Sequence, residues 1–178
     1  MRIDLTSLLD GRKSVLEAEY SYMPSDEGVL LPDEITLREP IQVRVTVTDK
    51  HGYMTLVASA TALYDTVCAR CLEPISTSAT FSVSRLIETG ADRHTQDHEH
   101  DEDYEDELLT LDGHFVEIDD DITEAFVLEL PMYHLCREDC PGLCPKCGKK
   151  LSEGDCGCSA KKEIDPRLAI LQKLLENP

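Results

Sequence analysis

The sequence predicts an α+β protein that is mainly antiparallel β, with a curled or barrel-like sheet, short helices and a C-terminal cysteine-rich segment. Three observations lead to this prediction. Apolar and polar residues alternate over 41–48, which is the period of a half-buried strand. Similar segments follow one another through short, turn-rich connections, as antiparallel neighbours do. Six of the eight cysteines lie between Cys136 and Cys158.

The predicted strands lie in the first half of the chain. The clearest is IQVRVTVT (41–48), whose isoleucine and three valines share one face. SVLEAEYSY (14–22) precedes it, and the stretch between the two is rich in Pro and Gly. A turn around Gly52 leads into a long strand that starts at residue 55 and reaches the first cysteine pair. The β-branched and hydroxyl-rich stretch 76–88 follows, and we expect these segments to form one sheet.

The segment 90–107 interrupts this pattern. Its run DHEHDEDYEDE holds 8 acids in 11 residues and no Lys or Arg, which is too much like charge to pack. We therefore predict a disordered or solvated acidic insert. His94, His98 and His100 lie in or beside it, and we interpret them as part of an acidic linker in preference to a weak metal site.

Two helices are predicted after the insert and a short strand HFVEI (114–118). In DDDITEAFVLELP the three aspartates suit a helix N-terminus, and Ile122, Phe126 and Leu130 recur on one apolar face before Pro131. DPRLAILQKLLEN, which begins at Asp165, reads as a short amphipathic helix near the end of the chain.

The predicted organisation is a β-rich domain over 1–135, which carries the insert at 90–107, and a cysteine-rich segment with its helix over 136–178. No apolar run is long enough for a transmembrane helix, and the first residues lack the apolar centre of a signal peptide. We therefore expect a cytoplasmic protein with no membrane partner, in which clustered thiols are metal ligands or redox groups more often than disulfides.

The net charge of −19 is unevenly distributed. The segment 136–178 holds 8 Lys and Arg against 7 Asp and Glu, whereas 1–135 holds 9 against 29. An anionic surface of that size repels nucleic acid, because phosphate binding needs Lys and Arg.

The cysteine spacing favours zinc. CPKCG places Cys144 and Cys147 in a C-x2-C turn in which Gly148 supplies a left-handed conformation, and CGC follows at Cys156 and Cys158. We group these four thiols on one zinc, so that the C-terminal segment is zinc-ribbon-like. The other four thiols would form a second site, and we expect one or two structural Zn²⁺ ions in all. The second site would be made of Cys68, Cys71, Cys136 and Cys140.

Alternatives to this grouping remain open from the sequence. One metal could use Cys136 and Cys140 together with the following C-x2-C pair, or His134 could replace a cysteine. Cys68 and Cys71 could also be two small buried residues on a strand.

Catalytic interpretations of the thiols are weaker. A catalytic zinc keeps an open position for water, whereas four thiolates fill every position. H-x-E occurs only at His100 to Glu102 in the acidic insert, and LCPKC lacks the P-C-x-x-C order of zinc deaminases. A C-x2-C redox centre needs a thioredoxin-like βαβ context, which the strand pattern does not provide. We therefore expect no catalytic residues and no small-molecule substrate.

The order of motifs along the chain resembles one family. RIDLTSL, CARCLEP, an acidic insert, IDDDITEAFVLELPMYHLC, CPGLCPKCG and DPRLAILQKL follow one another. In combination they resemble the YceD-type proteins, known as large ribosomal RNA subunit accumulation proteins. The resemblance implies a cytosolic factor without known catalytic activity, which supports large-subunit rRNA levels and ribosome assembly.

The implied partners are large-subunit rRNA precursor or ribosomal proteins. Direct RNA contact would use six cations near the cysteines, interrupted by acids: Lys146, Lys149, Lys150, Lys161, Lys162 and Arg167. A solvated surface around the zinc is an equally good interpretation of these cations. An acidic adaptor that binds a basic partner and a zinc- or thiol-dependent redox enzyme are the alternative functions.

Overall fold

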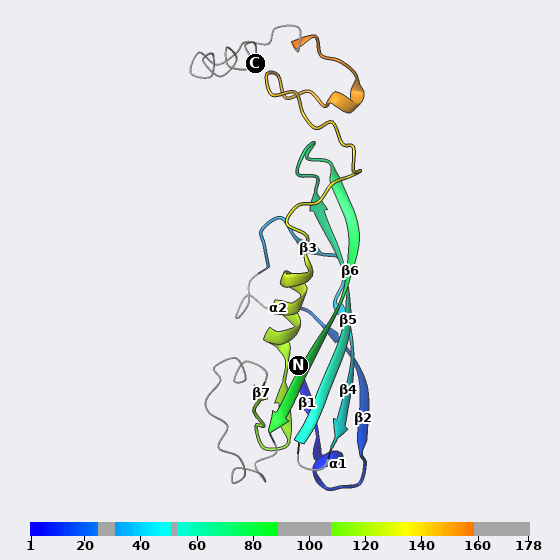
Figure 1. The fold of residues 1–178 in the computed structure, drawn as a ribbon, viewed down its shortest axis with the longest axis vertical. Coiled ribbons are helices and arrows are strands. Elements are labelled where there is room, and N and C mark those ends of the chain that lie inside the picture. Colours follow the sequence, from blue (N-terminus) through cyan, green and yellow to red (C-terminus); the bar gives the residue numbers. More distant parts are fainter. Residues whose placement is uncertain (25–30, 51–52, 89–107, 159–178) are drawn as a thin grey trace, which may run out of the picture.

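The computed structural model describes residues 1–24, 31–50, 53–88 and 108–158. The molecule is elongated, with the N-terminal elements at one end and the cysteine-rich segment at the other (Figure 1). Its elements in chain order are β1 (Arg2–Asp4), α1 (Thr6–Leu9), β2 (Val15–Tyr22), β3 (Thr36–Leu37), β4 (Ile41–Asp49), β5 (Tyr53–Val67), β6 (Pro74–Glu88), β7 (Leu108–Leu109), β8 (Phe115–Glu117), α2 (Asp119–Glu129) and the 3₁₀ turn η2 (Leu151–Glu153).

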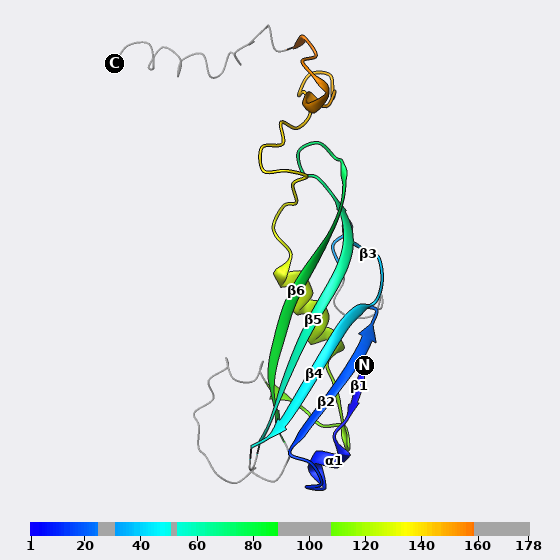
Figure 2. The same ribbon diagram turned by 90° about the vertical axis from the view of Figure 1, so that its right-hand side faces the viewer.

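The predicted α+β class with a curled, mainly antiparallel sheet is confirmed. The main sheet has the order β2-β4-β5-β6-β7, and β3 pairs with β5 beside this path. All its pairings are antiparallel except the two-residue pairing of β6 with β7. β5 and β6 are each 15 residues long and pair along their whole length, so this hairpin extends beyond the rest of the sheet (Figure 2).

One face of the sheet carries the core. The alternating valines of β4 are buried, as their pattern predicts, and Val43 and Val45 pair with the buried Ala60 and Ala58 of β5. α2 packs on this face, mainly against β6. The ring centroid of its Phe126 lies 5.5 Å from that of Tyr64 on β5 and 5.8 Å from that of Phe81 on β6. Phe126 is fully buried, so it anchors the helix on the sheet.

The position of α2 sets the path of the chain toward the cysteines. Near its start, Arg85 Nε of β6 donates to Asp121 Oδ1 at 2.6 Å, and both side chains are largely buried. The Tyr22 hydroxyl lies 3.0 Å from the Thr123 hydroxyl. From there α2 runs toward the turn of the β5–β6 hairpin (Figure 1). The residues after α2 therefore arrive beside that turn.

Several sequence predictions need refinement. The segment 114–118 does form a strand, β8, but it pairs with β1 in a separate two-stranded sheet. Leu130 is the C-cap of α2 and only half-buried, because the extended conformation before Pro131 ends the helix. The acidic insert and the predicted C-terminal helix lie outside the described residues. The domain division after residue 135 stays a prediction. In the described part of the chain, no helix is long and apolar enough to cross a membrane.

Candidate metal centres

The turn of the β5–β6 hairpin carries the first cysteine pair. Cys68 N–H donates to Glu73 O at 2.8 Å, and Leu72 N–H donates to Cys68 O at 2.9 Å. These bonds close a tight turn in which Leu72 has a φ of 59°, a left-handed conformation that non-glycine residues rarely adopt. The turn directs the Cys68 and Cys71 side chains to the same side. Both side chains are buried. The two cysteines lie in the turn, because β5 already ends at Val67, so the interpretation that placed them on a strand is wrong.

The second C-x2-C pair repeats this geometry. Cys144 N–H donates to Lys149 O at 2.8 Å, and Gly148 N–H donates to Cys144 O at 2.8 Å. Gly148 has a φ of 72°, as its place after Cys147 predicts. The chain thus contains two turns of the same type, each with a left-handed residue just after its second cysteine.

Four thiols meet at the hairpin turn, and we call this cluster the hairpin site. Cys68 Sγ lies 3.8 Å from Cys140 Sγ, and Cys71 Sγ lies 3.7 Å from Cys136 Sγ. All four sulfurs lie within 4.8 Å of one another. The residues after α2 are tied to the turn, because Ala69 N–H donates to His134 O at 2.9 Å.

Arg70 joins the same two segments from the hairpin side. Its Nη1 donates to Cys140 O at 2.9 Å, and its carbonyl accepts from Leu143 N–H at 3.1 Å. A Cβ at Gly142 would lie 3.1 Å from Arg70 O, so this close approach needs glycine. Leu135 and Leu143 pack against the buried cysteines.

The other four thiols form the ribbon site: Cys144, Cys147, Cys156 and Cys158. Their sulfurs also lie within 4.8 Å of one another. An isolated β-bridge pairs Leu143 with Lys150, and Leu151 N–H donates to Gly142 O at 3.0 Å. η2 then returns the chain to the last two cysteines. Three thiols of the hairpin site are buried, against one of the ribbon site, so the ribbon site is the more open cluster.

The sulfur geometry fits a tetrahedral metal. A tetrahedron with metal–sulfur bonds of about 2.3 Å spaces its sulfurs about 3.8 Å apart. The two sulfur–sulfur contacts of the hairpin site, at 3.8 and 3.7 Å, match this spacing. Disulfide bonds need about 2.0 Å between sulfurs, and all eight cysteines are free thiols. The clusters could therefore each hold one metal ion, and four sulfurs in a tetrahedron suit zinc or iron.

The thiol pKa values differ within each site. Burial would raise the pKa of Cys68, but backbone hydrogen bonds from neighbouring residues outweigh it and lower that pKa to about 6. Backbone N–H groups of Cys147 and Lys146 lower the pKa of Cys144 to about 6. The pKa of Cys158 rises to about 12, because the thiols of Cys147 and Cys156 interact with it. Thiolates this close repel one another, and a cation among them removes that repulsion.

The structure bears on the open alternatives for the ligand set. The cysteines gather in the two sets that their spacing favoured, and the competing set is divided between the two sites. His134 takes no cysteine's place. Its Nε2 instead lies 2.9 Å from the Tyr64 hydroxyl, and the two rings make an edge contact at 5.5 Å between centroids.

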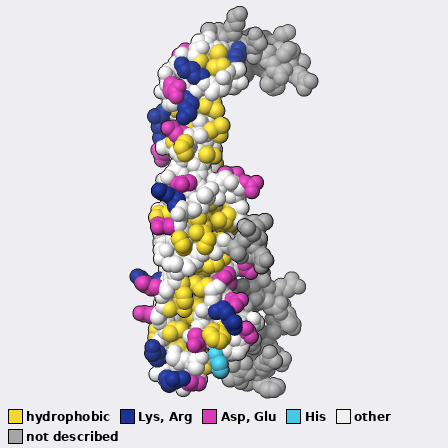
Figure 3. All heavy atoms as spheres, turned by 180° about the vertical axis from the view of Figure 1, so that it is seen from behind, with side chains coloured by type: hydrophobic (Ala, Val, Ile, Leu, Met, Phe, Trp, Pro, Cys, Tyr) yellow, Lys and Arg dark blue, Asp and Glu magenta, His cyan; other side chains and the backbone are white. Residues whose placement is uncertain are grey.

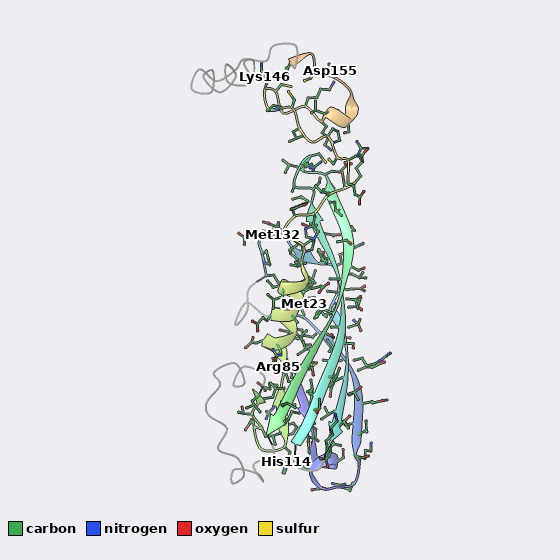
Figure 4. The ribbon with its side chains drawn as sticks, viewed as in Figure 1. Met23, Arg85, His114, Met132, Lys146 and Asp155 are labelled. Atoms are coloured by element: carbon green, nitrogen blue, oxygen red, sulfur yellow. The ribbon has the colours of Figure 1, made fainter. Side chains whose placement is uncertain are left out.

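The proposed RNA-contact residues are only partly described. Lys146 and Lys149 are exposed and Lys150 is half-buried. Lys161, Lys162 and Arg167 lie outside the described residues, as do the three histidines of the insert. Lys146 lies at the far end of the molecule near Asp155 (Figure 4). Acidic side chains stand among the basic ones at this end, so its visible face is mixed in sign (Figure 3).

Sequence reasoning missed three contributors to the hairpin site. Leu72 stands after Cys71, where a C-x2-C turn usually has a glycine. The glycine that identifies the turn at Cys144 and Cys147 is therefore absent from the turn at Cys68 and Cys71. Arg70 and Gly142 act through contacts between distant segments. A Gly between Cys140 and Cys144 is a sequence signal for close backbone approach, but the sequence does not name the partner.

Comparison with known proteins agrees with the motif order. The family of the large ribosomal RNA subunit accumulation protein YceD matches residues 56–175. An uncharacterized protein of Mycobacterium tuberculosis and one of Mycobacterium bovis are each 34% identical over 111 residues, or 61% of this chain and 49% of theirs. A Mycobacterium leprae protein is 44% identical over 36 residues, 20% of this chain and 17% of its own.

The matched part thus spans about half the length of the first two mycobacterial relatives. No solved structure matches the chain. The family match covers about two thirds of the sequence, including both C-x2-C turns, α2 and every candidate ligand. The chain belongs to the family of the large ribosomal RNA subunit accumulation protein YceD.

Proposed function

We propose that this protein is a non-enzymatic factor that supports the accumulation of large-subunit rRNA during ribosome assembly in the cytoplasm. The family match carries the proposal, because the family is named for this role. The two four-sulfur clusters at one end of the molecule support a structural use of its cysteines.

We propose that each cluster binds one Zn²⁺ ion through four thiolates. Zinc, when bound, would supply only cohesion, because four protein ligands leave no position for an activated water. In the hairpin site two ligands come from the hairpin turn and two from the chain after α2. That metal would therefore hold the C-terminal segment against the tip of the sheet. In the ribbon site all four ligands come from a 15-residue stretch, Cys144 to Cys158, which the metal would fold.

The charge distribution favours a basic ribosomal protein as the direct partner. The whole chain carries −19, and each zinc with four thiolates adds about −2. A surface of this sign attracts cationic proteins and repels phosphate. An acidic adaptor for a basic partner is thus a form of the same function.

Direct RNA contact is the second candidate, and the local charge balance at the cysteine-rich end supports it. Contact would use the six Lys and Arg residues identified from the sequence. Binding through them should weaken steeply as salt concentration rises, because each phosphate contact releases counterions. Binding to a purified ribosomal protein, with no binding to rRNA fragments at the same salt concentration, would favour the protein partner.

A thiol-redox enzyme makes a different prediction for the cysteines. Catalytic thiols are accessible and reactive, whereas thiolates held by zinc react slowly with alkylating reagents. The purified protein should hold two zinc ions and show no rapidly alkylated thiol. Rapid alkylation of a zinc-loaded sample would favour the enzyme.

Depletion of the protein in its own cell tests the function. We expect mature large-subunit rRNA to fall relative to small-subunit rRNA, and the wild-type chain to restore the ratio. An unchanged ratio of large-subunit to small-subunit rRNA, together with an unchanged ribosomal subunit profile, would refute the proposal. Because the partner is not assumed in this experiment, it separates the rRNA role from the question of direct contact.

A further inference from the structure

β6 forms an open edge of the main sheet over most of its length. One side of this strand pairs with β5 throughout, but on the other side only Leu86 and Ile87 pair, with β7. Among the described residues, no strand pairs with 74–85 on that side. Figure 2 shows β6 at the border of the sheet. Unpaired N–H and C=O groups along such an edge can template a further strand, and β7 already uses this edge at its lower end.

α2 lies beside the middle of this edge and makes a groove with it. Two adjoining hollows of about 490 and 450 Å³ share Ser82, Ala125 and Leu128 in their linings. The Leu128 side chain is 78% exposed, which is unusual for a large apolar residue. Thr80, Ser82 and Ser84 are small and exposed, so no long side chain blocks the strand. A strand edge next to a helix is the arrangement in which extended peptides bind by adding a strand.

The groove is anionic. Glu124 and Glu129 line it, and neither makes an ion pair within the described part of the chain. Arg85, labelled in Figure 4, is the only Lys or Arg in the lining of these two hollows. Asp121 pairs with it at 2.6 Å. An occupant should therefore bring cations. The chain's own insert, with 8 acids in 11 residues, has the wrong sign for this position.

We propose that the β6 edge and α2 bind an extended, Lys- or Arg-rich segment of another protein. This segment adds as a strand beside residues 80–85, sets an apolar side chain on Leu128 and directs cations toward Glu124 and Glu129. The inference names an interaction surface and the chemistry of its partner. The peptide-binding proposal does not depend on metal binding or on the rRNA role. It can therefore be wrong while the proposals on zinc and on rRNA remain correct.

The test uses the full zinc-loaded chain and a fluorescent eight-residue peptide of alternating valine and lysine. Its comparator has the same sequence with N-methyl groups on alternate residues, which keep the charge and remove backbone donors. At about 150 mM salt we expect the methylated peptide to bind about tenfold more weakly, because strand addition depends on backbone hydrogen bonds. Hydrogen exchange should slow at residues 80–85 when the unmodified peptide binds.

Two variants locate the site. Leu128→Ser should weaken peptide binding about tenfold, because it removes the apolar contact without adding a charge, and Glu129→Gln about threefold. Met132→Ser is the matched control, since it makes the same apolar-to-polar change at a fully exposed residue outside the groove. Its affinity should stay within twofold of the wild type. Leu128 is exposed, so its replacement should leave the circular dichroism spectrum unchanged.

Three results would overturn the proposal. Equal binding of the two peptides would show attraction to the net charge alone. Equal effects of Leu128→Ser and Met132→Ser would place the peptide elsewhere. A homodimer in sedimentation, with 80–85 protected before peptide is added, would assign the edge to a second copy of the chain.

Discussion

Replacing Cys71 by serine removes one ligand from the hairpin site and should release the segment after α2. Without a metal, three hydrogen bonds tie this segment to the hairpin turn: Ala69 N–H to His134 O, Leu143 N–H to Arg70 O, and Arg70 Nη1 to Cys140 O. At about 1 kcal/mol net each, they contribute about 3 kcal/mol. Ordering about nine backbone residues, 135–143, costs about 9 kcal/mol.

The zinc contribution decides this balance. Structural zinc binds small folded sites with about 10–16 kcal/mol of apparent free energy. Cohesion of the segment therefore depends on the metal, since hydrogen bonds and two half-buried leucines are too weak to replace it. We expect Cys71→Ser to hold one zinc per chain instead of two. The segment 134–143 should become open to protease, while α2 and the sheet below it stay folded.

Zinc content by mass spectrometry and limited proteolysis provide the assay. Ala69→Ser is the matched control, because it puts the same side chain at an exposed position of the same turn without removing a thiol. It should keep two zinc ions and the wild-type cleavage pattern. Two zinc ions in Cys71→Ser, with an unchanged cleavage pattern, would refute the ligand set.

Three other substitutions test the local geometry by thermal or denaturant unfolding. Gly142→Ala should destabilise the hairpin site by about 1–3 kcal/mol, because the new Cβ meets Arg70 O at 3.1 Å and the residue has a φ of 75°. A wild-type melting curve and zinc content would contradict this contact. Leu72→Gly should be neutral or stabilising by up to about 1 kcal/mol, because relief of the left-handed strain at φ 59° exceeds the entropy that glycine loses. A clear loss of stability would show that the exposed Leu72 side chain makes a contact that outweighs its backbone strain. Phe126→Ala should cost about 3–5 kcal/mol, because the ring is fully buried against Tyr64, yet the purified folded variant should keep two zinc ions. Loss of zinc in that variant would show that the metal sites depend on the core.

The sheet could be predicted from local pattern to a large extent. The alternation in 41–48 specifies a buried face by itself, and the two segments that pair with it carry the same period. The helix over 119–129 was predicted because its acids and its apolar spacing agree. Shorter elements such as β3 and β7, with two residues each, have too few residues to show a period, so they were missed.

The ribbon site was also predictable, because its four cysteines lie close in sequence and Gly148 marks the turn. In the hairpin site, by contrast, the ligands that contact each other are far apart in the sequence. Cys68 and Cys140 are 72 residues apart, and Cys71 and Cys136 are 65 residues apart. The sequence could suggest this site only by elimination, because these four cysteines remain once the ribbon site has been assigned. Their meeting depends on the length of the two 15-residue hairpin strands and on the direction of α2, and the spacing of the cysteines specifies neither.

The central claim is that both clusters are closed structural metal sites. Zinc K-edge X-ray absorption on the purified chain tests this claim most directly. We predict two zinc ions per chain, each with four sulfur neighbours at about 2.3 Å and no oxygen or nitrogen neighbour. An oxygen neighbour, or fewer than four sulfurs per zinc, would contradict the claim, because it would open a coordination position on which chemistry could occur.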